Sequence, residues 1–338
     1  MRKRLEKIIL VLAVAALLAA THLYITFYTP PSNIPESRTV TIERGLSFRM
    51  IAEKLEAAGV VRDADSFSFA GRVLGAYKKV KAGEYEFTTS MTPMEVLEYI
   101  VKGKVKRYLV TVPEGYNISE IAAALEEAGL VQRQVFIARA VDPALVRSLG
   151  LTGATFEGYL FPDTYAFNKG MSADEMISRM VERFRQVFSE FENDLEKSGM
   201  TMGKAVTLAS IIEKETGASS ERELISAVFH NRLRKGIRLQ SDPTVIYGLP
   251  GFDGNIKKQH LSMKSPYNTY VNFGLPPGPI ANPGKDSIAA ALRPAKADYL
   301  YFVSRNDGTH QFSKSLSEHN KAVNQYQKQM RLSKKADG

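Results

Sequence analysis

Residues 204–217 read Lys-Ala-Val-Thr-Leu-Ala-Ser-Ile-Ile-Glu-Lys-Glu-Thr-Gly, and the rest of the chain is best understood outward from this stretch. Its apolar residues recur at helical spacing, and no Gly or Pro interrupts it before Gly217, where a left-handed cap would end a helix. The pattern predicts a buried helix with two carboxylates, Glu213 and Glu215, at its C-terminal end. Side chains two residues apart project about 200° around a helix from each other, so these two cannot line the same site.

One of the two glutamates is a candidate general acid. Burying a charged carboxyl on a mostly apolar helix costs free energy, which raises its pKa and keeps it protonated near neutral pH. A protonated carboxyl of this kind can donate its proton in catalysis. The alternative is that both glutamates are solvated at a frayed helix end.

The composition describes a globular chain without thiol chemistry. Its 338 residues are 44% hydrophobic and 24% charged, which suits about two domains with sizeable cores. The absence of cysteine excludes disulfides, Cys-based zinc sites and catalytic thiols, and the 5 histidines lack ligand spacing, so we expect no metal and no other cofactor. The net charge of +9 favours anionic partners, but the basic residues are scattered, which argues against nucleic acid.

The N-terminal segment indicates a membrane location. Basic residues precede an apolar run that is long enough to cross a bilayer as a helix. This predicts a cytoplasmic tail at 1–7, a transmembrane helix at 8–28 and an extracytoplasmic remainder, in a single-pass protein of the inner (cytoplasmic) membrane. A cleaved signal peptide is the alternative, because the alanines between Ala13 and Ala20 offer small-residue cleavage sites.

An internal repeat follows a Pro- and Ser-containing linker at 29–38, which we expect to be stiff and to lift the next domain off the membrane. Residues 40–61 recur as 110–131, and each copy predicts a short strand, a Gly turn, a capped helix and a Gly stop. Asn117 with Glu120 is a capping box, whereas Ser47 caps the first copy without one. Such a duplication more often serves architecture than chemistry.

Several irregular segments carry polar and aromatic side chains. Tyr159, in the aromatic stretch 157–165, either lines a sugar-binding groove or packs in the core. Residues 265–270 and 274–284 contain too much Pro and Gly for regular helix or central strand, and such loops hold polar groups in place at low entropic cost. Asp242 either caps a helix that begins at Pro243 or contacts substrate.

Further elements are expected from capping signals and periodicity. They are a long amphipathic helix from Ser172 to Leu195, a helix capped by Ser220 that ends near Arg232, a helix capped by Asp286 that ends at Leu292, strands at 299–303 and 308–312, and a polar C-terminal helix.

In their order along the chain, five stretches resemble the YceG-like family, the MltG-type endolytic murein transglycosylases. They are Ala209-Ser-Ile-Ile-Glu-Lys-Glu-Thr216, Asn231-Arg-Leu233, Leu239-Gln-Ser-Asp-Pro-Thr-Val-Ile-Tyr-Gly248, Tyr267-Asn-Thr-Tyr270 and Gly274-Leu-Pro-Pro-Gly-Pro-Ile280. The resemblance covers nearly the whole chain, and several motifs in one order are more specific than any single motif.

The resemblance implies an α+β chain with a transmembrane helix, a LysM-like subdomain at 39–108, a mixed α+β catalytic domain with a lysozyme-like active-site helix at 109–331, and a basic tail at 332–338. It implies that Glu213 is the catalytic acid and that Glu215 points elsewhere. The residues expected to hold the sugars are Asn231, Gln240, Asp242, Asn268, Tyr270 and Tyr159.

We therefore expect an enzyme that cleaves the bond between N-acetylmuramic acid and N-acetylglucosamine in nascent peptidoglycan, leaves 1,6-anhydro ends and terminates strand elongation. One acid is enough, because the C6 hydroxyl of the sugar replaces water and the acetamido group can stabilise the cationic centre. Glycan strands are the expected partner, with peptidoglycan synthases and division proteins as further partners. The alternatives are a hydrolytic muramidase and a membrane-anchored, peptidoglycan-binding scaffold without catalysis.

Overall fold

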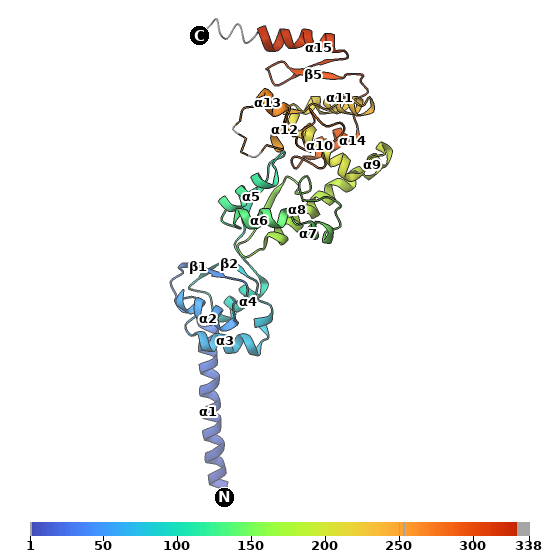
Figure 1. Cartoon of the computed structure of the whole chain (residues 1–338). Helices are drawn as coiled ribbons and strands as arrows, with labels where there is room; N and C mark the ends of the chain where they lie inside the picture. Colours follow the sequence, from blue (N-terminus) through green and yellow to red (C-terminus); the bar gives the residue numbers. More distant parts are fainter. Residues whose placement is uncertain (1, 250, 253, 330–338) are drawn as a thin grey trace, which may run out of the picture. The chain divides into compact units, whose positions relative to one another are not determined.

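The computed structural model describes residues 2–249, 251–252 and 254–329, so the basic tail expected at 332–338 lies outside the described residues. The described chain divides into two compact units (Figure 1). The first holds residues up to Leu109 together with Ala166–Ser172, and the second holds Val110–Tyr165 and the residues from Ala173 onward. Helices and short strands occur in both units, which confirms the mixed α+β class.

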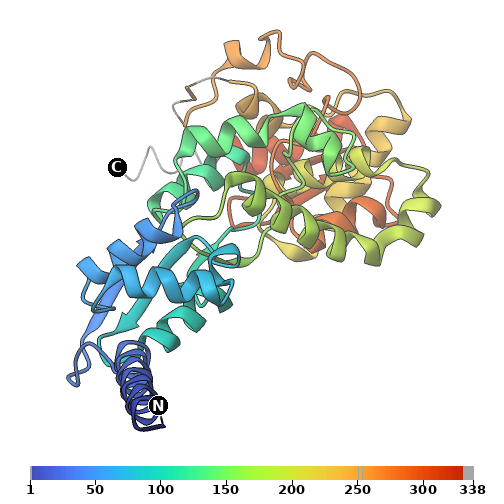
Figure 2. The same cartoon turned by 90° about the horizontal axis from the view of Figure 1, so that it is seen from below.

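The first unit is a two-stranded sheet with helices against one face (Figure 2). Its elements are α1 (Arg2–Tyr28), β1 (Ser37–Ile42), α2 (Phe48–Ala57), α3 (Ala64–Val73), the 3₁₀ turn η1 (Ala76–Lys78), β2 (Gly83–Thr88) and α4 (Pro93–Lys102). β1 and β2 are antiparallel, with Val40 opposite Tyr85. Because side chains alternate along a strand, Val40 and Tyr85 are buried in the helix-covered core while Thr39 and Glu86 are exposed on the other face.

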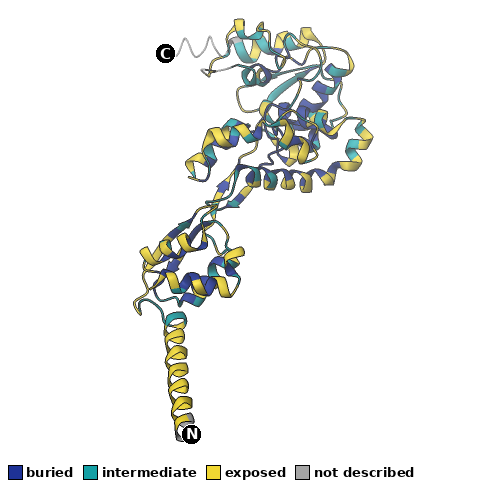
Figure 3. Cartoon of the chain, turned by 60° about the horizontal axis from the view of Figure 1, so that its bottom comes forward, coloured by how far each residue is buried: buried dark blue, intermediate teal, exposed yellow. Residues whose placement is uncertain are grey.

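The α1 helix differs from every other element of the first unit in its exposure (Figure 3). Its segment Lys7–Tyr28 is the one helix among the described residues that is long and apolar enough to cross a membrane, and none of that segment is buried. The predicted apolar N-terminal helix is therefore confirmed. A membrane anchor and a signal sequence both fit this finding.

The segment after α1 does not stand free as the spacer that its prolines predict. Arg62 Nη2 donates to the carbonyl of Pro30 at 2.7 Å, the Ser32 N–H donates to the Thr89 carbonyl at 3.1 Å, and Thr89 Oγ1 donates to the Ile34 carbonyl at 2.7 Å. These bonds hold the segment against the first unit, because its backbone groups find partners there.

The helices of the internal repeat are capped as predicted. Ser47 accepts a hydrogen bond from the Met50 N–H at the start of α2, and Asn117 forms a capping box with Glu120. Gly59 and Gly129 follow their helices with φ of +70° and +66°, a conformation that Gly adopts without strain.

The second unit is built around α10 (Met202–Glu215), which is buried from Ala205 to Ile212 and packs against α14 and α11. The strands β3 (Tyr108–Thr111) and β4 (Thr164–Phe167) each have residues in both units. The other elements of the second unit are α5 (Ile118–Glu127), α6 (Arg133–Ala140), α7 (Pro143–Ser148), α8 (Ala173–Phe188), η2 (Ser189–Phe191), α9 (Glu192–Ser198), η3 (Ser219–Glu221), α11 (Arg222–Arg234), α12 (Asp242–Tyr247), α13 (Lys258–Leu261), α14 (Lys285–Leu292), β5 (Tyr301–Ser304), β6 (His310–Ser313), α15 (Leu316–Val323) and the π-helix η4 (Asn324–Gln329).

Several predicted helix ends are wrong in detail. The α10 helix ends because Thr216 is extended, with φ −142° and ψ 136°, and Gly217 does not adopt the predicted left-handed conformation. Ser220 lies inside the η3 turn and does not cap α11, and Asp286 lies inside the first turn of α14, whose N-cap is Gly284. Asp242 is likewise the first residue of α12 rather than its cap. A cap needs a residue with extended backbone outside the helix, which sequence spacing alone does not locate.

The long helix predicted to reach Leu195 is broken. The α8 helix stops at Phe188, and the turn η2 leads into the separate helix α9.

Near the C-terminus, β5 and β6 pair antiparallel with Tyr301 opposite Ser313. The β5 strand is only half-buried, so the prediction of a buried strand there is wrong.

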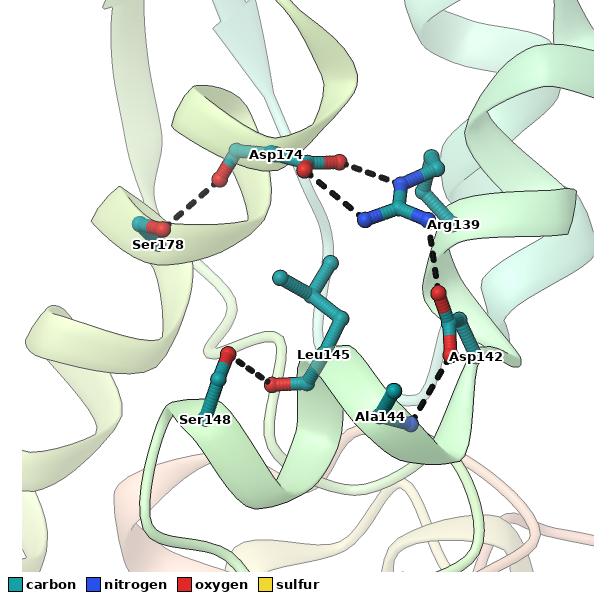
Figure 4. Close-up of polar contacts among 7 residues, drawn as sticks. All are labelled: Arg139, Asp142, Ala144, Leu145, Ser148, Asp174 and Ser178. Atoms are coloured by element: carbon teal, nitrogen blue, oxygen red, sulfur yellow. Dashed lines mark hydrogen bonds and ion pairs between the residues drawn. The ribbon is translucent and has the colours of Figure 1, made fainter.

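A bidentate ion pair joins α6 to α8 (Figure 4). Arg139 Nε and Nη2 donate to the two carboxylate oxygens of Asp174 at 2.6 and 2.9 Å, and Arg139 Nη1 donates to Asp142 at 2.6 Å. Asp142 in turn caps α7 by accepting from the Ala144 N–H. The planar guanidinium thereby fixes the directions of three helices, while its exposure to solvent limits its contribution to stability.

Gly158 offers a test of the packing around α10. Its φ is +87°, and a Cβ there would lie 2.5 Å from Pro279 Cγ and 2.8 Å from Val206 Cγ1. We expect Gly158→Ala to lower the free energy of unfolding by about 2–4 kcal/mol, since overpacking adds to the left-handed strain. Gly199→Ala is the matched control, because Gly199 has φ +67° but open space around it. Equal losses in chemical denaturation of the two full-length variants would contradict the packing argument.

Candidate active site

The C-terminal turn of α10 places its two glutamates in different surroundings, as their spacing predicts. Glu213 faces the N-terminus of α14, whereas Glu215 faces the loop that precedes α12.

Glu213 is held by a cation and by a helix N-terminus. Its Oε2 accepts a hydrogen bond from the Gly284 N–H at 2.9 Å, and its Oε1 lies 3.4 Å from Nη2 of the buried Arg222. Gly284 is the N-cap of α14, where the helix dipole favours a negative charge. Arg222 also lies 3.8 Å from Glu114 and 3.8 Å from Asp286, so the carboxylate of Glu213 belongs to a charge cluster that joins α10, α11 and α14.

The surroundings of Glu215 raise its pKa. Burial raises its pKa to about 7, the neighbouring Asp242 acts in the same direction, and the hydrogen bond from Ser241 together with the charge of Arg232 opposes the shift. Ser241 Oγ donates this hydrogen bond to Glu215 Oε1. The sequence predicts a raised pKa for a buried carboxyl on this helix, and Glu215 has one. Glu215 can therefore hold a proton near neutral pH.

Three of the predicted substrate-binding residues gather around Glu215. Gln240 is exposed and has a left-handed φ of 51°, and Asp242 is exposed beside it. Tyr270 Oη donates to Asp242 Oδ1 at 2.6 Å. Burial first, and then the hydrogen bond to Asp242, raise the pKa of Tyr270, so its hydroxyl stays a neutral donor.

The loop carrying Gln240 and Asp242 is fixed by backbone contacts. The Gln240 N–H donates to the Thr269 carbonyl at 3.1 Å, and the Ser241 N–H donates to Thr269 Oγ1 at 3.0 Å. Two segments that are far apart in sequence therefore present one polar edge beside Glu215, with their positions set before any ligand arrives.

The other three predicted substrate-binding residues hold the fold together. Asn231 Nδ2 donates to the carbonyls of Ala297 and Tyr299 at 2.8 and 2.9 Å. Asn268 donates to the Met263 carbonyl at 2.8 Å, and its Oδ1 accepts from the Tyr270 N–H at 2.9 Å. The third of these residues, Tyr159, packs against another aromatic ring.

Tyr159 packs in the core, the second of its two predicted roles. Its side chain is buried, and its ring meets that of Phe184 edge-on, with centroids 5.1 Å apart and planes at 82°. Asn231 and Asn268 are buried in the same way. The structure thus separates these three residues from the exposed edge formed by Gln240 and Asp242.

The structure has a second buried carboxyl in this unit, Glu157, to which the sequence pattern does not point. It accepts hydrogen bonds from the Ile118 N–H at 3.2 Å, from Tyr247 Oη at 3.1 Å and from Asn282 Nδ2 at 3.0 Å. Burial raises its pKa to about 7 despite these bonds. Its partners lie 39, 90 and 125 residues away in sequence, so no local pattern reveals them.

Asn282 connects Glu157 to the rest of the site. Its backbone N–H and its Nδ2 both donate to the Tyr116 carbonyl at 2.8 Å, and its Oδ1 accepts from the Leu160 N–H at 2.8 Å. Two residues later, Gly284 donates to Glu213, and a Cβ at this position would overlap the carboxyl of Glu114. The Pro-rich loop 274–284 is therefore held in place by the side chain of Asn282 and by the backbone N–H of Gly284.

Within the described ranges, no group of three or more His, Asp or Glu side chains is arranged to hold a metal ion.

Comparisons with known proteins show the family of this chain. The model of the YceG-like family matches residues 40–325. A protein of Bacillus subtilis named endolytic murein transglycosylase is 34% identical over 303 residues, which are 85% of this chain and 84% of that protein. A protein of the same name from Streptococcus pneumoniae is 32% identical over 317 residues, and the match spans 84% of this chain but 57% of the longer relative.

A solved structure is similar as well. The crystal structure of a putative yceG-like protein from Listeria monocytogenes superposes with a TM-score of 0.59 at 36% sequence identity, covering 85% of this chain and 98% of that one.

Glu157 generates a prediction about stability and pH. An acid whose pKa is raised from 4.5 to about 7 in the folded state binds its proton more tightly there, so the folded state loses stability as pH rises through this window. We expect Glu157→Gln, which mimics the protonated form, to be close to wild type at low pH and more stable above neutral pH, by about 3 kcal/mol at most.

The measurement is urea unfolding of the full-length protein on both sides of this pH window. Glu127→Gln serves as the control, because it removes an exposed carboxyl from α5. If Glu157→Gln keeps the pH dependence of the wild type, the buried carboxyl does not titrate as described.

Proposed function

Because the chain belongs to the YceG-like family, we propose that it is an endolytic murein transglycosylase, a lyase that cleaves between N-acetylmuramic acid and N-acetylglucosamine and leaves 1,6-anhydro ends. The observation that carries the proposal is the position of Glu215 at the end of the buried helix α10, where Ser241 donates to it and the exposed Asp242 is a neighbour; burial there raises its pKa. Relatives that share most of this chain carry the same name.

Glu215 is the better general acid of the two glutamates on physical grounds. Its pKa near 7 keeps a large fraction protonated at neutral pH, which suits proton donation. Glu213 instead forms an ion pair with Arg222 and accepts from the N-terminus of α14, contacts that give it a structural role. The family resemblance points to Glu213, so the assignment has two candidates that one experiment separates.

The proposed reaction uses one carboxyl twice. The acid form of Glu215 gives its proton to the glycosidic oxygen as the bond from that oxygen to C1 of the muramic acid breaks. The resulting carboxylate then takes the proton of the C6 hydroxyl while O6 bonds to C1, which closes the anhydro ring without water. The acetamido group of the substrate stabilises the cationic centre in between, so no second carboxylate is needed.

The residues around Glu215 supply contacts to sugar. Asp242 and Gln240 offer exposed acceptors and donors, and Tyr270 adds a neutral hydroxyl and an aromatic face. Asn231 and Asn268 support this edge from the interior by fixing the loops on which it is built. Tyr159 contributes packing.

The α1 helix would serve as an uncleaved anchor in the cytoplasmic membrane. The basic residues before the apolar segment favour a cytoplasmic N-terminus, which places both units outside the cytoplasm, where peptidoglycan lies. The first unit is the LysM-like subdomain and would contact glycan, and α10 corresponds to a lysozyme-like active-site helix. Termination of growing strands, and contact with synthases or division proteins, would follow from this location.

Replacing the glutamates one at a time identifies the acid. We expect Glu215→Gln to lower the rate of glycan cleavage by about 10²–10⁴-fold, since it removes the proton donor, and Glu213→Gln to keep most of the activity. The reverse pattern would return the role to Glu213. Glycan binding is measured in parallel, and cleavage that survives in both variants would refute an acid on α10.

The same digests test the reaction type. Mass spectrometry of uncrosslinked glycan should give ends that lack one water relative to hydrolysed ends. Hydrated reducing ends would indicate a muramidase, and intact glycan with bound protein would indicate a scaffold.

The pKa of Glu215 predicts the high-pH limb of the activity. Because the acid must be protonated to donate, the cleavage rate should fall as pH rises through about 7. The same fall in rate should persist in the Glu157→Gln variant. Glu157 also has a pKa of about 7, but it takes no part in the proposed reaction. If the fall in rate disappears in Glu157→Gln, the titrating group is Glu157 and not Glu215.

A further inference from the structure

The first unit exposes a patch of large apolar side chains at the end of α3. The patch, hereafter the α3 patch, consists of Phe69, Val73, Leu74 and Tyr77, whose exposed fractions are 63%, 67%, 56% and 46%. Phe69 and Val73 lie one helical turn apart, and the other two follow on the adjoining turn. Neighbouring apolar side chains with this exposure usually mark an interaction surface.

Helix α3, which carries most of the α3 patch, lies beside the last turns of the apolar helix α1 (Figure 1). Phe69 lines a groove together with Leu23, Thr26 and Phe27, and Leu74 lines another with Tyr28. The segment long enough to cross a membrane ends at Tyr28. The α3 patch is therefore level with the end of the proposed transmembrane span.

The turns that follow α3 add cations to the α3 patch, while Asp65, Glu95 and Glu98 line the two grooves beside it. Residues 66–83 contain no Asp or Glu, but they contain the exposed cations Arg72, Lys78, Lys79 and Lys81. Lys78 Nζ lies 5.5 Å from the centre of the Tyr77 ring. Apolar and aromatic side chains bordered by cations suit the boundary between acyl chains and anionic headgroups, whereas protein interfaces are depleted of lysine.

We propose that the α3 patch rests in the headgroup layer of the leaflet from which α1 emerges. Phe69, Val73 and Leu74 would reach the acyl boundary, and the neighbouring cations would meet the phosphates of anionic phospholipids. The hydrogen bonds of Pro30 and Ser32 to the first unit hold it close to α1 and leave no spacer between them. This inference rests on the part of the proposed function that keeps α1 as an anchor, and it adds a lipid contact for the first unit.

Single cysteines test the contact directly, because the chain has none of its own. Full-length Val73→Cys, Thr39→Cys and Leu17→Cys proteins are labelled with an environment-sensitive dye in bilayers of phosphatidylethanolamine and phosphatidylglycerol. Thr39 is the control in the same unit, on the sheet face turned away from the helices, and Leu17 reports the span of α1. We expect lipid-borne quenchers to reduce the dye signal several-fold more at 73 than at 39.

Each outcome decides the inference. Strong quenching at 17 with equal, weak quenching at 73 and 39 overturns the lipid contact and leaves the anchor standing. Weak quenching at 17 overturns both. A dye at 73 that is shielded from a water-soluble quencher but not reached by the lipid-borne one indicates a protein partner and also overturns the proposal. Replacing phosphatidylglycerol with phosphatidylcholine should reduce quenching at 73 alone, and no change would refute the role of the cations.

Discussion

The burial of α10 from Ala205 to Ile212 leaves this helix only its ends on which to carry charge. A carboxyl in such a place can be accommodated in two ways, with a cation or with its proton. Arg222 lies 3.4 Å from Glu213, whereas burial raises the pKa of Glu215 despite the hydrogen bond from Ser241. One helix thereby places two carboxyls in different surroundings within a single turn.

Burial alone does not decide which carboxyls are perturbed. Glu84 in the first unit is buried, but hydrogen bonds from Lys169 and Tyr108 lower its pKa. Glu157 is buried among neutral donors, and its pKa is raised. The difference lies in the charge of the partner, since a cation compensates the ionised carboxyl and a neutral donor does so only in part.

Buried amides hold the irregular segments on which the exposed edge of the site depends. Pro- and Gly-rich loops leave backbone groups without the partners that helices and sheets provide. Asn268 and Asn282 replace those partners, because an amide side chain donates and accepts at the same time. Asn231 does the same where α11 meets the segment before β5. The residues that resemble substrate contacts in sequence thus include the supports of the site.

Local patterns in the sequence determined the apolar helix α1, the buried helix α10, the capped helices of the repeat and the family, because periodicity, caps and motif order depend on near neighbours. Tertiary structure alone decided that Glu157 is buried among partners from distant segments and that Asn231 and Tyr159 face inward. It also decided that Arg222 lies beside Glu213 and that burial raises the pKa of Glu215. The physical reason is that a pKa or a contact depends on groups that folding brings together from distant parts of the chain, and neither the spacing nor the type of neighbouring residues encodes them.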